Sequence, residues 1–263
     1  MTTEPTAREL LLEGDPHDAA LERHVHPPDW KNPTPPGRYN LVVVGGGTAG
    51  LVAAGGAAML GGKVALVERR LMGGDCLNFG CVPSKALLRS AGVARTVREA
   101  GAFGVETGPA RVDFAKVMER VRALRAEIAP HDSAERFKGL GADVYLGEGR
   151  FVAPDTLEVG GQRLTFARAI IATGGKPRLP DVPGLKDVDF LTSESVFSLT
   201  SLPPRLVVLG GGPIGCELAQ AFGRLGARVS LVAKDSRLLP KDDPEAAALL
   251  ARRLEAEGVR LYL

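Results

Sequence analysis

A glycine-rich unit occurs twice in the chain, and a shift of 165 positions superimposes the two copies without a gap. The first copy begins YNLVVVGGGTAG and the second begins RLVVLGGGPIG. Three glycines recur at the same spacing, pairing Gly45 with Gly210, Gly47 with Gly212, and Gly50 with Gly215. In each copy a short apolar run precedes the glycines, and a second apolar run, KVALVE or ARVSLVA, follows about a dozen residues later. Such a repeat indicates one supersecondary unit used twice.

Each copy predicts a strand, a tight glycine turn and the start of a helix. The first glycine permits the turn, the second lets the backbone approach a pyrophosphate, and the third lets the helix pack closely on the strand. The helix N-terminus then offers unpaired N–H groups to phosphates. A single G-x-G-x-x-G motif is weak evidence, but context and duplication strengthen it here. The predicted fold class is α/β, with two Rossmann-like, doubly wound dinucleotide-binding units, the second of them incomplete.

The two copies differ where their second strand ends. The first ends in Glu68, a carboxylate suited to the hydroxyls of an adenine ribose. The second has Ala233 at that position, followed by Lys234 and, nearby, Arg237. Positive side chains favour a ribose 2′-phosphate, so the second site is predicted to prefer NADP. Asp235 lies close enough to keep NAD open as the alternative.

Cys76 and Cys81 flank LNFG, and only Cys216 completes the cysteine inventory. A zinc site needs four ligands. A purely structural disulfide that closes so small a loop lowers the entropy of the unfolded chain only slightly and so stabilises the fold little. Five residues of regular helix rise about 7.5 Å, which exceeds the usual Cα separation limit of a disulfide of about 6.8 Å. The bond therefore needs a distorted turn, which Asn78 and Gly80 can supply. Pro83 suits a first helical turn, so Cys81 is expected near a helix N-terminus that favours a thiolate. A redox-active disulfide is therefore the favoured interpretation, and no metal site is predicted.

Composition and charge exclude several other classes of protein. The net charge is +2 with both signs interspersed, so no nucleic-acid footprint is expected. The uncharged run 41–62 is long enough to span a bilayer, but its eight glycines follow the phosphate-binding rule instead, and no membrane span is predicted. The N-terminal residues resemble neither a secretory signal nor a transit peptide. A cytoplasmic location is the expectation.

The rest of the chain is interpreted by pattern. Residues 1–38 are rich in proline and predict an extended N-terminal arm with one short helix near 18–23. Apolar periodicity predicts helices over 83–99 and 114–128, and short strands over 143–146, 156–159 and 169–172. PDVPGL, residues 180–185, is expected to link the domains. The predicted domains are therefore the arm 1–38, an FAD-binding domain with the redox disulfide over 39–190, and a partial NAD(P)-binding domain over 191–263.

GGDCLNFGCVPSKALL, the two glycine fingerprints, Glu68 and AIIATGGKPRLP together resemble the pyridine nucleotide–disulfide oxidoreductases. That family includes dihydrolipoamide dehydrogenase, glutathione reductase and mercuric reductase. The resemblance runs from about residue 40 to the last residue, and the ending Ala233–Lys234 is most similar to the mercuric reductase branch.

The resemblance implies a relay of two electrons. FAD would lie along the first glycine turn, and NAD(P)H would dock on the second and pass hydride to the flavin. Cys81 would face the isoalloxazine as a thiolate, and Cys76 would attack the substrate. The remaining family positions are Lys85 near the reactive flavin nitrogen, Glu217 as an acidic partner, and Gly74, Thr173 and Gly174 at the cofactor.

The resemblance also implies segments that this chain lacks. Family members continue further, and GVRLYL at 258–263 is expected to be the third strand of the second nucleotide unit. The later segments return an aspartate to the FAD domain and carry a dimerisation domain with a His–Glu pair. A truncated reading frame, a split enzyme and a decayed remnant all stay open. The isolated chain is expected to hold FAD weakly and to turn over poorly, and the family's homodimer is doubtful for it.

Three functional hypotheses follow. The leading one is an NADPH-preferring flavoprotein reductase of small-molecule disulfides or of mercuric ion. The second is a dihydrolipoamide dehydrogenase-like enzyme that uses NAD. The third is an inactive or partner-dependent N-terminal half of such an enzyme.

Overall fold

The computed structural model describes residues 5–263 and divides into two compact units. Unit 1 consists of the residues up to 83 together with 122–198, and unit 2 consists of 84–121 together with 199–263. The domains predicted from motifs begin at 39 and 191. The contacts instead group 84–121 with the second nucleotide unit, and the chain passes for the last time from unit 1 to unit 2 between Ser198 and Leu199.

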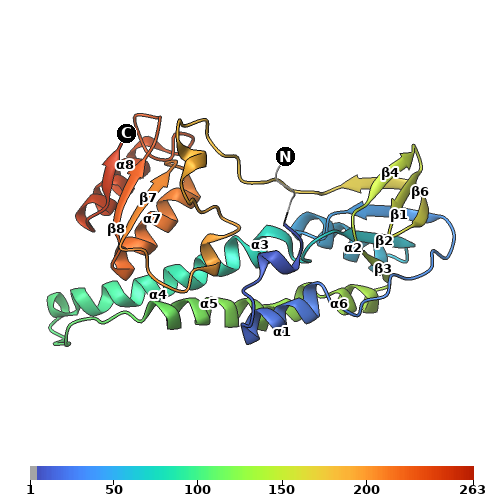
Figure 1. The fold of residues 1–263 in the computed structure, drawn as a ribbon, viewed down its shortest axis with the longest axis horizontal. Coiled ribbons are helices and arrows are strands. Elements are labelled where there is room, and N and C mark those ends of the chain that lie inside the picture. The colour runs from blue at the N-terminus through green and yellow to red at the C-terminus, as the bar shows by residue number, and fades with distance from the viewer. Residues whose placement is uncertain (1–4) are drawn as a thin grey trace. The chain divides into compact units, whose positions relative to one another are not determined.

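Unit 1 is built on a six-stranded sheet in the order β3-β2-β1-β6-β5-β4 (Figure 1). The strands are β1 (Tyr39–Val44), β2 (Val64–Glu68), β3 (Ala142–Leu146), β4 (Arg150–Ala153), β5 (Thr156–Val159) and β6 (Gln162–Ile171). β1 pairs in parallel with β2 and β6, and β2 pairs in parallel with β3. β4, β5 and the first half of β6 form an antiparallel meander. The long strand β6 thus joins the parallel layer to the meander.

Both faces of the parallel strands are covered, because neighbouring residues of a strand point to opposite sides. On β1, Val43 belongs to the apolar cluster that contains α1, α2 and α6, whereas Val42 belongs to the cluster with the meander residues. The helices of unit 1 are α1 (Pro16–Val25), α2 (Thr48–Met59), α3 (Gly74–Asn78) and α6 (Ala134–Gly139). Short 3-10 turns occur at Arg8–Leu10, Ala129–Asp132, Leu185–Asp187 and Val196–Ser198.

The N-terminal segment, residues 5–38, is part of unit 1 and is not extended throughout. α1 includes the short helix expected near 18–23, and its Leu21 and Val25 are fully buried in the helical core. Trp30 donates its indole N–H to the carbonyl of Val144 at 3.1 Å. The side chain of Asn32 pairs with both the N–H and the carbonyl of Leu146, at 2.8 and 3.0 Å. Buried apolar side chains and these contacts to β3 correct the expectation of an extended arm.

Unit 2 contains a three-stranded parallel sheet in the order β7-β8-β9 (Figure 1). Its strands are β7 (Arg205–Leu209), β8 (Arg228–Val232) and β9 (Arg260–Tyr262), and its helices are α7 (Pro213–Leu225) and α8 (Pro244–Ala256). α4 (Cys81–Glu99) and α5 (Phe114–Ile128) contribute most of their length to unit 2, with a 3-10 turn at Ala100–Phe103. Phe114 of α5 packs on Phe222 of α7 with ring centroids 5.9 Å apart.

The fold class predicted from the sequence is confirmed. α2 begins at Thr48 and α7 begins at Pro213, so both copies of the glycine unit form strand, turn and helix at corresponding positions. The final residues form β9, parallel to β8, as predicted. The strand predicted over 169–172 is the end of the longer β6, and the helix predicted from 83 begins at Cys81.

Within residues 5–263, none of the helices combines the length and the apolar character needed to cross a bilayer.

Candidate functional site

The turn between β1 and α2 is closed by glycines that admit no side chain. Gly45 has a φ of +109°, and a Cβ there would stand 2.2 Å from the carbonyl oxygen of Ala172. A Cβ on Gly50 would stand 1.7 Å from the carbonyl oxygen of Gly45. Gly47 is the N-cap of α2. Gly45 and Gly50 thus lie where backbone segments approach closely, which agrees with the roles in the tight turn and in helix packing that were predicted for them.

The cysteine motif begins against this glycine turn. A Cβ on Gly74 would come within 2.6 Å of the Cα of Gly47, and the N–H of Gly73 donates to the carbonyl of Gly46 at 2.8 Å. Gly74 is also the first residue of α3, which carries Cys76. The structure thus brings the predicted phosphate-binding turn and the predicted redox motif into direct backbone contact.

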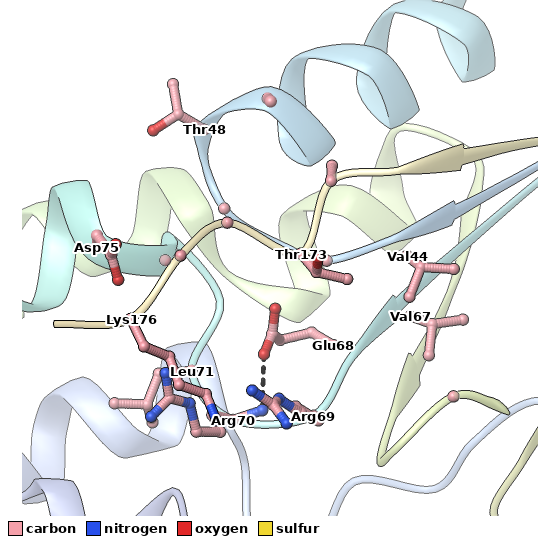
Figure 2. A pocket seen from close by; sticks show the side chains of 18 of the residues that line it. Val44, Thr48, Val67, Glu68, Arg69, Arg70, Leu71, Asp75, Thr173 and Lys176 are labelled. Carbon is pink, nitrogen blue, oxygen red and sulfur yellow. Dashed lines mark hydrogen bonds between the residues drawn. The ribbon is translucent and has the colours of Figure 1, made fainter. Parts of the chain in front are cut away.

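Glu68 points from the end of β2 toward the β1–α2 turn, with Thr173 close by (Figure 2). Its Oε2 accepts a hydrogen bond from the N–H of Gly46 at 2.6 Å, and its Oε1 accepts one from the N–H of Arg70 at 2.7 Å. An ionised carboxylate has about four acceptor sites. Both oxygens are therefore fixed in position and still keep capacity for a ligand's hydroxyl groups.

A cavity of about 550 Å³ lies over this turn in unit 1. The predicted residues that line it are Gly45, Gly47, Glu68, Gly74, Cys76, Thr173 and Gly174. Gly50 is absent from the lining because it serves the packing of α2 behind the turn. Sequence reasoning missed Thr48, Asp75 and Lys176, which also line the cavity (Figure 2). Each lies within three residues of a predicted site position, and that adjacency was the available signal.

The two cysteines of the motif lie next to each other, with their thiols hydrogen-bonded. Cys76 is half-buried in α3, and Cys81 is exposed as the first residue of α4. Burial raises the pKa of the Cys76 thiol, and its hydrogen bond with the Cys81 thiol raises that pKa further. A hydrogen bond from Thr48 opposes these effects. The break between helices falls at Phe79 and Gly80, so Asn78, expected in the turn, is the last residue of α3 instead.

The surroundings of the first glycine turn have features that suit a dinucleotide. A side chain at Gly45 would strike the carbonyl of Ala172, and one at Gly74 would strike the Cα of Gly47. Both glycines therefore keep the backbone close beside the N-terminus of α2, where a pyrophosphate would bind. Glu68 closes one part of the same cavity and Cys76 another. The cavity therefore brings the N-terminal turn of a helix, a carboxylate and a cysteine to one space of about 550 Å³.

The second glycine turn, in unit 2, repeats the construction. Gly210 has a φ of +118°, and a Cβ on Gly215 would stand 2.0 Å from the carbonyl oxygen of Gly210. Gly212 is the N-cap of α7. Lys234 is exposed just after β8. Arg237 instead donates to the carbonyls of Leu239, Pro240 and Asp242 at 2.6–3.2 Å, so its guanidinium stabilises its own loop.

Lys85 and Glu217, the other predicted catalytic residues, are both exposed and both belong to unit 2. Lys85 lies one turn after Cys81 on α4, and Glu217 lies in the second turn of α7. Their roles stay predictions.

Comparison with known proteins gives concordant results. Residues 39–263 match the family described as pyridine nucleotide-disulphide oxidoreductase. Mercuric reductase from Bacillus cereus is 37% identical over 223 residues, which cover 85% of this chain and 35% of that protein. Dihydrolipoyl dehydrogenase from Bacillus subtilis (strain 168) is 40% identical over 238 residues, covering 84% and 49%.

A solved structure is also similar, that of the HOCl-induced flavoprotein disulfide reductase RclA from Escherichia coli. It aligns with a TM-score of 0.71 and 28% sequence identity, over 86% of this chain and 49% of that one. The chain therefore spans between about a third and a half of the length of these three proteins.

Proposed function

Because the chain belongs to the pyridine nucleotide-disulphide oxidoreductase family, we propose that it passes electron pairs from NAD(P)H through FAD to a Cys76–Cys81 disulfide. A small-molecule disulfide or mercuric ion would be the final acceptor. The observation that carries the proposal is that Cys76, Glu68 and the glycines of the first turn line one cavity.

FAD would be held by residues of unit 1. The N-terminus of α2 and the glycine turn would face its pyrophosphate, and Glu68 would accept from its adenosine ribose. When bound, FAD supplies the two-electron chemistry that connects a hydride donor to a disulfide. Thr173 and Gly174 would contact it from the end of β6. This assignment follows from the residues that line the cavity.

The cysteines would store the electron pair. Reduction breaks the S–S bond with two electrons, and protons are taken up by whichever sulfur is not left as a thiolate. Because burial raises the pKa of Cys76, this sulfur takes a proton readily near neutral pH. Cys81, the first residue of α4, would be the second sulfur of the pair. Cys76 would attack the acceptor after losing its proton.

The direct test is anaerobic and needs a single turnover. We expect the chain, oxidised and loaded with FAD, to gain two thiols, in the peptides of Cys76 and Cys81, when one equivalent of NADPH is added. A long-wavelength absorption band should appear with them and should be missing in Cys81→Ser. Flavin reduction without new thiols in these two peptides would refute the proposal.

The nicotinamide nucleotide would bind at the second glycine turn, with Lys234 favouring a 2′-phosphate. We expect Lys234→Ala to lower the preference for NADPH over NADH by about five- to tenfold, because one charge-assisted contact contributes roughly 1–1.5 kcal/mol at an exposed site. The measurement is the ratio of the two rates of flavin reduction. Lys241→Ala, which removes an exposed lysine from the same loop, is the matched control. An unchanged ratio, or a wild-type preference for NADH, would contradict the assignment.

A second candidate is a dihydrolipoamide dehydrogenase-like activity with NAD. The Bacillus subtilis dihydrolipoyl dehydrogenase, at 40% identity, is as similar to the chain as the mercuric reductases at 36–37%. Reducing the chain once and then offering lipoamide, glutathione disulfide or mercuric ion separates these acceptors by their rates of thiol reoxidation.

A further inference from the structure

The loop between the two cysteines is hydrogen-bonded to a buried arginine. Asn78 lies between Cys76 and Cys81, and its side chain is fully buried. Its backbone carbonyl accepts a hydrogen bond from Nη1 of Arg125 at 3.0 Å. Its own amide donates to the carbonyls of Met72 and Gly74 at 3.1 and 2.8 Å. Both the backbone and the side chain of Asn78 are therefore fixed.

Arg125 is in turn held by an aspartate of the N-terminal segment. Nη2 of Arg125 donates to Oδ1 of Asp18 in α1, and both side chains are only 1% exposed. The other oxygen of Asp18 accepts from the N–H of Leu12 at 2.9 Å. A second link runs from the N–H of Met72 to the carbonyl of Val25, at the end of the same helix, at 3.0 Å. Asp18 lies outside the residues 39–263 that match the family.

We propose that Asp18 and Arg125 are positioning residues that keep the sulfurs of Cys76 and Cys81 adjacent. The inference rests on the proposed function, since it assumes that these two cysteines form the redox pair. Neither residue touches a sulfur in the contacts described. They act through the carbonyl of Asn78, because fixing that peptide group fixes the end of α3 relative to the start of α4.

The physical consequence concerns the balance between disulfide and dithiol. An intramolecular disulfide is favoured in proportion to the effective concentration of one thiol at the other. Releasing the carbonyl of Asn78 lets the loop sample conformations in which the sulfurs are apart. The disulfide is then less stable relative to the dithiol, and the reduction potential becomes less negative. A tenfold change in this equilibrium constant corresponds to about 30 mV for a two-electron couple.

The experiment equilibrates the full chain in glutathione redox buffers and counts oxidised Cys76 and Cys81 by alkylation and peptide mass. It needs neither FAD nor turnover. We expect Arg125→Gln, too short to reach the carbonyl, to shift the equilibrium about tenfold toward the dithiol, or about 30 mV. Asp18→Asn should shift it at least threefold in the same direction, and Arg125→Lys, which keeps one donor, should fall between the wild type and Arg125→Gln.

Asp15→Asn is the matched control. Asp15 lies one residue before α1 and forms its own buried ion pair with Arg122, at 2.7 Å and with side chains 8% and 7% exposed. Asn is as good an N-cap as Asp, so the cap of α1 at the N–H groups of His17 and Asp18 is retained. No contact of Asp15 or Arg122 to the cysteine loop occurs among the hydrogen bonds described for residues 5–263. This variant should shift the equilibrium less than twofold.

The outcomes separate the two proposals. A wild-type chain that forms no Cys76–Cys81 disulfide even in the most oxidising buffer would refute the proposed function, and the inference with it. A wild-type disulfide with Asp18→Asn and Arg125→Lys both within twofold of its equilibrium constant would overturn the inference alone. Equal shifts in Asp15→Asn and Asp18→Asn would also overturn it, because they would show a general effect of loosening α1. Should circular dichroism show that Arg125→Gln does not fold, Asp18→Asn and Arg125→Lys decide the question.

Discussion

Gly50→Ala is expected to weaken FAD binding at least a hundredfold and to destabilise unit 1 by about 3 kcal/mol or more. The added Cβ would stand 1.7 Å from the carbonyl oxygen of Gly45 and 2.9 Å from its carbon. Gly45 cannot shift to make room, because its N–H donates to the carbonyl of Val67 at 2.8 Å and its Cα already faces the carbonyl of Ala172. α2 must therefore move away from β1, and its N-terminus would leave the place where the pyrophosphate is expected.

The control lies six residues further along the same helix. At Gly56 a Cβ meets nothing within 4 Å, so Gly56→Ala should leave FAD affinity unchanged and stabilise the protein by about 0.5–1 kcal/mol. FAD affinity is measured by titration of flavin fluorescence, and stability by urea unfolding. Wild-type FAD affinity in Gly50→Ala would show that the cofactor does not depend on this turn.

Cys76→Ser is expected to lower the reduction of a disulfide acceptor at least a thousandfold while leaving the reduction of bound FAD by NADPH unchanged. A serine oxygen cannot form or exchange a disulfide, whereas the turn, Glu68 and the cavity stay as they are. Cys216→Ser is the matched control. Cys216 is buried in α7, and its thiol contacts the carbonyl of Gly211 at 3.6 Å, a hydrogen bond that serine can also donate.

The same measurement carries a pH signature. Burial raises the pKa of the Cys76 thiol, so the thiol keeps its proton to a higher pH than an exposed cysteine does. Only the thiolate attacks, and the rate with the acceptor should therefore rise with pH, by up to tenfold per unit, until the pKa of Cys76 is passed. Loss of activity in Cys216→Ser equal to that in Cys76→Ser, or a rate that falls between neutral and alkaline pH, would contradict the role of Cys76.

Local spacing predicted most of the nucleotide-binding geometry. Gly45, Gly50, Gly210 and Gly215 were identified from their order between strand and helix. A side chain at Gly45, Gly50 or Gly215 would strike backbone atoms, and Gly210 has a φ of +118° that L side chains rarely adopt. This works because most of the motif's interactions close within a few tens of residues, although Gly45 also approaches Ala172, 127 residues further along the chain. The end of β2 at Glu68 follows from the same short-range rules, and α4, predicted to begin at Pro83, begins two residues earlier at Cys81.

Long-range partners escaped sequence reasoning for a physical reason. Nothing near Asp18 in the chain indicates that its carboxylate pairs with Arg125, 107 residues away. Periodicity places Arg125 on a helix but does not show that its head group is buried. Arg237 shows a further limit, since this positive charge at the expected distance from β8 donates to carbonyls of its own loop. Charge and spacing identify candidates, and only the contacts assign partners.

The two hydrogen bonds between Asn32 and Leu146 join residues 114 positions apart in the sequence, and this separation has a consequence for biosynthesis. At about 5–20 residues per second, a ribosome needs roughly 6–23 s to make the intervening chain. During that interval the nascent N-terminus has none of its final neighbours from β3, and the apolar stripe of α1 faces water or a chaperone. The segment that comes first in the message thus completes its docking late, and we expect cotranslational protease sensitivity there to persist until β3 has left the exit tunnel.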